Sequence, residues 1–170
     1  MRTDGIWANI FSLVQSDQGL KEILRRVPIF RDLGDRELQI LTDIVHTRTY
    51  QPDEIIFMES EPGAGMYVIQ SGGVDILLNH GSDEPLYLAQ LESGDFFGEM
   101  ALLGDPERSA TARSRERSEL IGFFHPDLLE IMDLHPSMGA KITLGLSRTL
   151  AERLRFTNDQ LRKIWEIKAT

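Results

Sequence analysis

The central part of the chain, residues 48–124, divides its apolar residues into short runs that turn-forming residues separate. Eight of the fourteen glycines fall between Gly63 and Gly104, so the backbone can reverse its direction often. The apolar runs are residues 55–58, 66–69, 74–78, 86–91, 110–112 and 120–124. Short runs at this spacing are typical of antiparallel strands, and they predict a β-barrel or jelly roll of about eight strands.

Helical patterns are predicted upstream of these strands. The apolar spacing over residues 7–14 is typical of an amphipathic helix, and a second helix starts at Ser16 and Asp17 and ends before Pro28. A third helix opens at Asp35, with its apolar residues on one face. We therefore expect an N-terminal helical region over residues 1–47.

Two prolines set the starts of helices downstream of the strands. Pro126 fits the first turn of a short helix through Met132 or Asp133, and Pro136 opens a helix that can run to about Lys168. A helix of that length would span roughly 50 Å, more than a small β-domain can cover. Apolar residues at heptad spacing form a seam along it: Leu150, Leu154, Leu161 and Ile164, with Thr157 between them. The seam favours a homodimer through this helix, and the alternative is a helix folded back on its own domain.

The chain is thus predicted to be an α+β protein in three zones. N-terminal helices occupy residues 1–47, the β-barrel or jelly roll occupies residues 48–125, and C-terminal helices occupy residues 126–170. The last zone contains the long helix, for which both dimerisation and covering of the β-domain are possible uses.

Composition excludes several classes of protein. The 170 residues include no cysteine, which excludes disulfides, thiolate metal sites and a cysteine nucleophile. No apolar run approaches the roughly 18 residues of a membrane span, and no secretory signal is found, so we expect a cytoplasmic protein without membrane contact. The four histidines lack metal-ligand spacing, and no catalytic triad or dinucleotide fingerprint occurs. We therefore expect no enzyme, no metal and no cofactor.

Charge is distributed unevenly along the chain. The net charge is −9, but residues 51–112 contain twelve acidic side chains and one basic side chain, Arg108. Such a surface repels nucleic acid, whose binding depends on the neutralisation of phosphates. Two interpretations of Arg108 remain: an ordinary surface ion pair, or a receptor for an anionic ligand.

The segment over residues 94–112, GDFFGEMALLGDPERSATA, favours the receptor. Gly98 permits a tight backbone path into a short helix, whose first N–H groups have no partner within the helix. Arg108 offers donors suited to bidentate binding of phosphate, and the small residues Ser109 and Ala110 let a ligand approach the backbone. A carboxylate beside a phosphate is best used to accept hydrogen bonds from hydroxyls, which is the role we infer for Glu99. A sugar phosphate satisfies both requirements.

At residues 97–112 the chain resembles the phosphate-binding cassette of the cyclic nucleotide-binding domain family. The resemblance extends upstream over residues 50–57 and 66–72. It implies that Glu99 accepts the ribose 2′-hydroxyl and that Arg108 pairs with the cyclic phosphate. The other residues that it places at the ligand are Gly98, Met100, Ala101, Ser109 and Ala110 around the phosphate and sugar, and Ile76 and Leu88 in the wall.

The resemblance also implies a function, a regulatory sensor domain that binds cAMP or cGMP. Ser109, where threonine is the alternative, favours cAMP. The family uses its C-terminal helix as a lid, and counting from Pro136 places either Arg153 and Leu154 or Thr157 and Asn158 at the base. Two other functions stay open: the effector domain of a transcription regulator without its DNA reader, and a dimerisation scaffold with an empty pocket.

Overall fold

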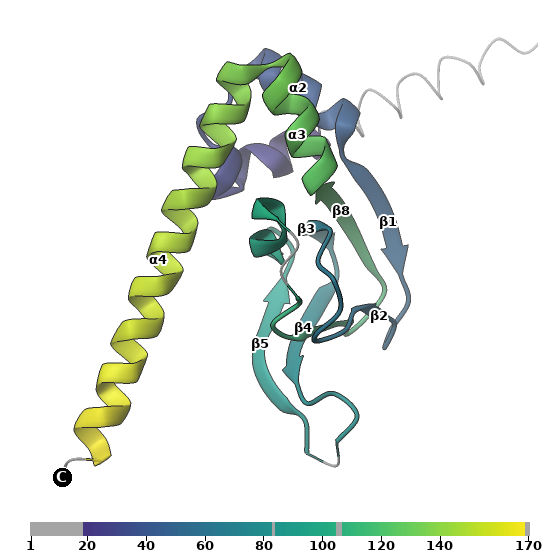
Figure 1. The fold of residues 1–170 in the computed structure, drawn as a ribbon. Helices are drawn as coiled ribbons and strands as arrows, with labels where there is room; N and C mark the ends of the chain where they lie inside the picture. The colour runs from purple at the N-terminus through teal and green to yellow at the C-terminus, as the bar shows by residue number, and fades with distance from the viewer. Residues whose placement is uncertain (1–18, 83, 105–106, 169–170) are drawn as a thin grey trace, which may run out of the picture.

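The computed structural model describes residues 19–82, 84–104 and 107–168, and its strands form two antiparallel sheets (Figure 1). The strands are β1 (His46–Tyr50), β2 (Ile55–Phe57), β3 (Gly65–Ser71), β4 (Gly73–Leu78), β5 (Leu86–Glu92), β6 (Phe96–Phe97), β7 (Thr111–Ser114) and β8 (Ser118–Phe124). One sheet has the order β1-β8-β3-β6 and the other the order β2-β7-β4-β5. The predicted jelly roll is confirmed, as two separate layers of four strands and not as a closed barrel.

The helices gather at one end of this sandwich, and the last of them projects away from it (Figure 1). Residues 19–26 are helical, and they are followed by η1 (Pro28–Phe30), α2 (Asp35–Ile44), η2 (Glu99–Leu103), α3 (His125–Leu134) and α4 (Pro136–Lys168). The predicted helix starts at Asp35 and Pro136 are confirmed. The helix expected over residues 7–14 lies outside the described residues, and so does the expected start at Ser16 of the next helix, whose predicted end before Pro28 is confirmed.

Pro126 lies in the first turn of α3, as expected, and the helix begins at His125. A capping contact fixes this start, because the Asp127 carboxylate accepts a hydrogen bond from the Phe124 backbone N–H at 2.8 Å. The carboxylate of Glu37 caps α2 in the same way, by accepting from the Gly34 N–H at 2.7 Å. In both helices an acidic side chain three residues after the cap fixes where the helix begins.

Two apolar cores meet at the short helix η2. The first core joins the helices to the β1-β8-β3-β6 sheet, and Leu102 of η2 is fully buried in it. The second core lies between the sheets and contains Phe97, the residue that precedes the turn into η2. The segment from Phe97 to Leu102 is thus anchored on both sides, which holds the residues between them in a defined position.

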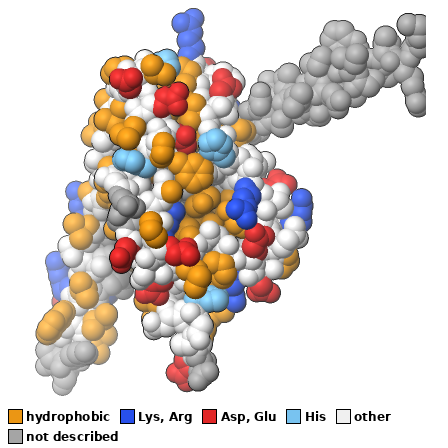
Figure 2. Space-filling model, turned by 45° about the vertical axis from the view of Figure 1, so that its right-hand side comes forward, with side chains coloured by type: hydrophobic (Ala, Val, Ile, Leu, Met, Phe, Trp, Pro, Cys, Tyr) orange, Lys and Arg blue, Asp and Glu red, His pale blue; other side chains and the backbone are white. Residues whose placement is uncertain are grey.

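Helix α4 runs without interruption through Gly145. The structure gives this glycine a packing role, because a Cβ atom there would lie 2.3 Å from the Ile29 carbonyl oxygen of η1. The side chains of residues 151–167 are exposed, and Figure 2 shows hydrophobic side chains along this projecting part. The seam residues Leu154 and Leu161 are exposed in the single chain. Exposure does not show what covers them, and dimerisation through the seam stays a prediction. In the described part of the chain, no helix is long and apolar enough to cross a membrane.

Candidate ligand pocket

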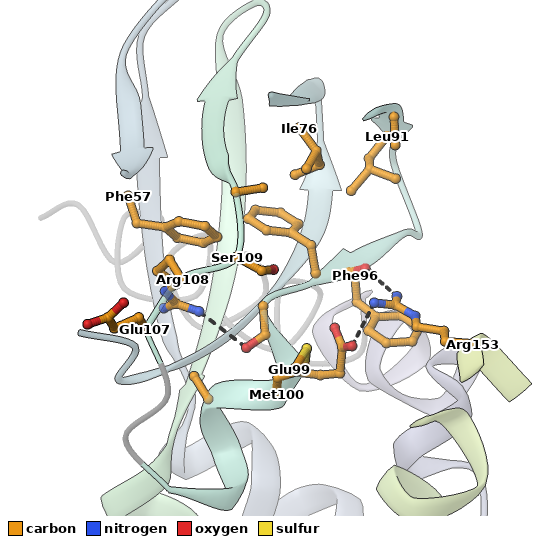
Figure 3. Close-up of a pocket in the computed structure, with 15 residues that line it drawn as sticks. Phe57, Ile76, Leu91, Phe96, Glu99, Met100, Glu107, Arg108, Ser109 and Arg153 are labelled. Carbon is orange, nitrogen blue, oxygen red and sulfur yellow. Dashed lines mark hydrogen bonds and ion pairs between the residues drawn. The ribbon is translucent and has the colours of Figure 1, made fainter. Parts of the chain in front are cut away.

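A cavity of about 260 Å³ opens between the β2-β7-β4-β5 sheet, the helix η2 and helix α4 (Figure 3). Its lining residues are Phe57, Ile76, Ala89, Leu91, Phe96, Phe97, Gly98, Glu99, Met100, Ala101, Glu107, Arg108, Ser109, Ala110 and Arg153. The volume lies near the lower limit of typical small-molecule sites, which are roughly 300–1,000 Å³. The cavity is mostly apolar, with a few convergent polar groups, as such sites usually are.

Gly98 makes the turn that leads into η2. Its φ of +75° lies in the left-handed region that favours glycine. A Cβ atom at this position would also lie 2.7 Å from the Arg108 Nη1 atom and 3.2 Å from the Gly65 carbonyl oxygen. The backbone conformation therefore favours glycine at the point where the chain passes Arg108, and any side chain there would press on the Arg108 guanidinium.

Arg108 is a buried cation without an acidic partner among the described residues. Its side chain is almost enclosed, at 7% exposure, and its guanidinium lies 3.9 Å from the ring centre of Phe57. Nη1 donates a hydrogen bond to the Gly98 carbonyl at 3.2 Å, while Nε has no partner. Burial lowers the pKa of Arg108 from its usual value, although Tyr67, Glu61 and Glu99 act in the opposite direction.

This environment leaves a charge to be neutralised. Burial of a charged group is costly unless it is paired, and a ring face and a single carbonyl supply only part of the compensation. The interpretation of Arg108 as an ordinary surface ion pair is wrong, because the side chain is buried and has no carboxylate within ion-pair distance in the described chain. The pocket is suited to an anion that reaches this guanidinium.

Glu99 is also buried, at 2% exposure, and it pairs with α4 and not with Arg108. The Nη1 atom of Arg153 lies 2.7 Å from a Glu99 carboxylate oxygen, and Nη2 donates to the Phe96 carbonyl at 3.2 Å (Figure 3). The same guanidinium lies 4.9 Å from the ring centre of Phe96. The long helix is thereby attached to the first residue of η2, on the opposite side of the pocket from Arg108.

The structure brings together eight of the nine residues that the sequence placed at a ligand: Ile76, Gly98, Glu99, Met100, Ala101, Arg108, Ser109 and Ala110. Leu88 does not line the cavity, and its side chain is 51% exposed. Strand alternation puts Leu88 on the face opposite to Ala89 and Leu91, and Leu88 is also the extra residue of a bulge, since Ile76 pairs with Ala89 while Leu77 pairs with Tyr87. Ala89 takes its place, and counting back by two from Leu91 along the strand would have found it.

Of the two counts along α4, the ungapped one has one of its two residues, Arg153, at the cavity, and the residue that covers the base stays a prediction. Arg153 lines the cavity, whereas Leu154, Thr157 and Asn158 do not. Sequence reasoning missed the aromatic residues Phe57 and Phe96. Their contacts with Arg108 and Arg153 join distant parts of the chain, so no local pattern marks them.

Known proteins are similar to this chain over the region that forms the pocket. A family model described as the cyclic nucleotide-binding domain matches residues 47–135. The cyclic AMP receptor protein of Thermus thermophilus is 32% identical over 125 residues, which cover 74% of this chain and 58% of that protein. A putative potassium channel protein of Rhodopseudomonas palustris is 33% identical over 141 residues, which cover 81% of this chain and 34% of that protein.

Solved structures agree with the sequence matches. The crystal structure of the Thermus thermophilus catabolite activator protein is similar, with a TM-score of 0.71 and 31% sequence identity. The similarity covers 81% of this chain and 62% of that one. This chain therefore spans less than two thirds of the length of each of these relatives.

Proposed function

The chain belongs to the cyclic nucleotide-binding domain family, and from this membership we propose that its pocket binds a cyclic nucleotide, with cAMP as the first candidate. The observation that carries the proposal is Arg108, a buried guanidinium with an unpartnered Nε and no carboxylate partner in the described chain. A cyclic phosphate supplies one negative charge and acceptor oxygens in the same place, which suits the fork of an arginine.

The rest of a cyclic nucleotide fits the other walls of the pocket. The phosphate lies against Arg108 and the hydroxyl of Ser109, at the end where Gly98 turns. The ribose 2′-hydroxyl donates to the Glu99 carboxylate, which accepts a hydrogen bond there without facing the phosphate. The base lies toward the apolar residues Ile76 and Leu91, with the guanidinium of Arg153 at the mouth. Gly98, Met100, Ala101 and Ala110 complete the surroundings of the sugar and phosphate.

The proposed signal is a shift in the docking of α4. Arg153 attaches α4 to Glu99, the group that receives the ribose hydroxyl in this proposal. A nucleotide that draws η2 toward its phosphate, and shares Glu99 with Arg153, interacts differently with the docked and undocked positions of α4. Only such a difference in affinity lets a ligand change the population of two states. The domain then acts as a sensor that signals by a change of conformation, and it catalyses no reaction in this proposal.

The partners follow from the same features. The exposed seam of Leu154, Leu161 and Ile164 pairs with the seam of a second copy, which would remove these side chains from water. The acidic β-domain is unsuited to nucleic acid, and we place the protein in the cytoplasm, where a cyclic nucleotide would reach it. The proposed function needs neither a metal nor a cofactor, and it involves no catalytic residue.

Isothermal calorimetry with cAMP, cGMP and 5′-AMP tests the proposal. The expected result is saturable binding of cAMP, weaker binding of cGMP and at least about tenfold weaker binding of 5′-AMP, because an open dianionic phosphate does not match a site with one arginine. The proposal would be overturned if neither cyclic nucleotide gave a heat of binding to a chain that circular dichroism shows to be folded. Equal binding of 5′-AMP would show a general nucleotide site.

A further inference from the structure

The helix η2 is attached to the C-terminal helices at both of its ends. At its start, Glu99 pairs with Arg153 of α4, as described above. At its other end, the Leu102 carbonyl oxygen lies 2.7 Å from the Nδ1 atom of His125, the first residue of α3. The second contact lies outside the ligand cavity, and the proposed binding of a nucleotide does not use it.

The chemistry of this contact is fixed by its acceptor. A carbonyl oxygen only accepts hydrogen bonds, so the Nδ1 atom of His125 carries the proton. Carbonyl groups at the end of a short helix lack partners within the helix, and Leu102 is fully buried. The imidazole therefore supplies the partner that water cannot. The backbone N–H of His125 donates to the Ala64 carbonyl at 2.8 Å, which holds the start of α3 in place beside the sheet.

The two helices beyond His125 form a closely packed pair. A Cβ atom on Gly139 of α4 would lie 2.8 Å from the Met132 Cγ atom of α3, so α3 and α4 approach each other closely there. The Leu102 side chain packs in the same core cluster as Leu128 and Ile131 of α3. A displacement of η2 is therefore passed to α3 through a hydrogen bond and a packed core, and from α3 to α4.

We propose that His125 is a positioning residue that couples the position of η2 to the docking of α3 and α4. The role in signalling rests on the proposed function, while the attachment itself can be measured without any ligand. The contacts form a closed circuit: η2 holds His125, α3 packs on α4, and Arg153 of α4 returns to Glu99. Loss of the His125 side chain removes the contact between η2 and α3, which lies outside the cavity that the nucleotide occupies in the proposed function.

The attachment is tested first in the ligand-free chain by hydrogen–deuterium exchange. His125→Leu keeps the bulk of the side chain and removes the donor, and amide exchange should become about tenfold faster in residues 99–103 and in residues 125–134 together. His125→Asn places an amide N–H near the position of Nδ1 and should restore most of the protection. His135→Leu, the same change at the exposed other end of α3, should leave both segments unchanged. Exchange that is unaltered in His125→Leu, or altered in only one of the two segments, would overturn the coupling.

The transmission is tested with cAMP and paired spin labels. The chain has no cysteine, so Arg117→Cys beside the sandwich and Lys163→Cys on α4 give clean attachment sites, and dilution with unlabelled chain removes distances between copies. The parent should change its label distance on saturation with cAMP. His125→Leu should still bind cAMP in calorimetry and lose most of that change, and His125→Asn should recover it.

A full change of distance in saturated His125→Leu would overturn the role in transmission. No binding of cAMP by the parent would instead refute the proposed function, and the exchange measurement would still decide the attachment.

Discussion

Replacement of Arg108 by alanine separates a ligand receptor from a structural group more sharply than any other single change. In the proposed complex, this change leaves the cyclic phosphate without its cation, in a part of the sequence that holds twelve acidic groups. Removal of one partner of a buried charge pair costs about 2–5 kcal/mol, so the affinity for cAMP should fall by roughly 30-fold to several thousand-fold. Arg108→Lys should recover only part of this loss, because an ammonium cannot form the bidentate fork.

The ligand-free stability should respond very differently. Arg108→Ala removes a contact with the Phe57 ring, worth about 0.5–2 kcal/mol, and a hydrogen bond worth about 1 kcal/mol. It also relieves the desolvation of a guanidinium that has no acidic partner in the described chain, which is the largest cause of the lowered pKa of Arg108. These contributions oppose each other, and 1 kcal/mol corresponds to about 2–4 °C in a chain of this size. The melting temperature without ligand should therefore change by no more than about 4 °C.

Calorimetry with cAMP and thermal melts without ligand measure the two quantities on the same preparations. The matched control is Arg117→Ala, which removes a side chain that is 65% exposed and lies outside the pocket. It should leave both affinity and melting temperature unchanged. Unchanged affinity in Arg108→Ala would refute the assignment of this residue as the phosphate receptor. A large loss of melting temperature in the ligand-free variant would show that the guanidinium serves the fold.

Three further changes test other parts of the structure. Glu99→Ala should weaken cAMP binding by about tenfold in calorimetry, less than Arg108→Ala does, because it removes a hydroxyl acceptor and also a carboxylate from the anion site. Leu154→Glu combined with Leu161→Glu should give monomers in sedimentation velocity, and an unmodified protein that is monomeric throughout would contradict the dimer. Gly145→Ala should lower the free energy of unfolding by about 1–3 kcal/mol, since its Cβ would lie 2.3 Å from the backbone of η1. Gly19→Ala, where nothing lies within 4 Å of the added Cβ, should not lower it.

The parts of the site that the sequence could predict are those that a short segment fixes by itself. Gly98, Glu99 and Arg108 lie within one stretch whose turn, short helix and return bring them together, so their spacing carried the prediction. Leu88 does not line the cavity, because the pocket face of β5 carries Leu91 and Ala89 and strand alternation puts Leu88 on the other face. The bulge at Leu88, which no local pattern marks, is a separate feature of the pairing with β4. A register that depends on the pairing of two strands is decided by packing and not by local propensity.

The attachments of α4 depend on distances across the molecule. Two counts along the helix are consistent with the sequence, and the packing of α4 on η1 brings Arg153, and not Thr157 or Asn158, to the cavity. The pairing of Arg153 with Glu99 could not be inferred, because both residues have several possible partners in an open chain. The same holds for His125, because its partner at the end of η2 lies 23 positions away in the sequence.

A crystal structure of the chain with cAMP bound is the most direct test of the central claim, that Arg108 receives the phosphate of a cyclic nucleotide. The account predicts that phosphate oxygens lie about 3 Å from the guanidinium of Arg108 and that the ribose 2′-hydroxyl lies at the same distance from the carboxylate of Glu99. A nucleotide held elsewhere on the chain, or one whose phosphate lies away from Arg108 inside the pocket, would contradict it.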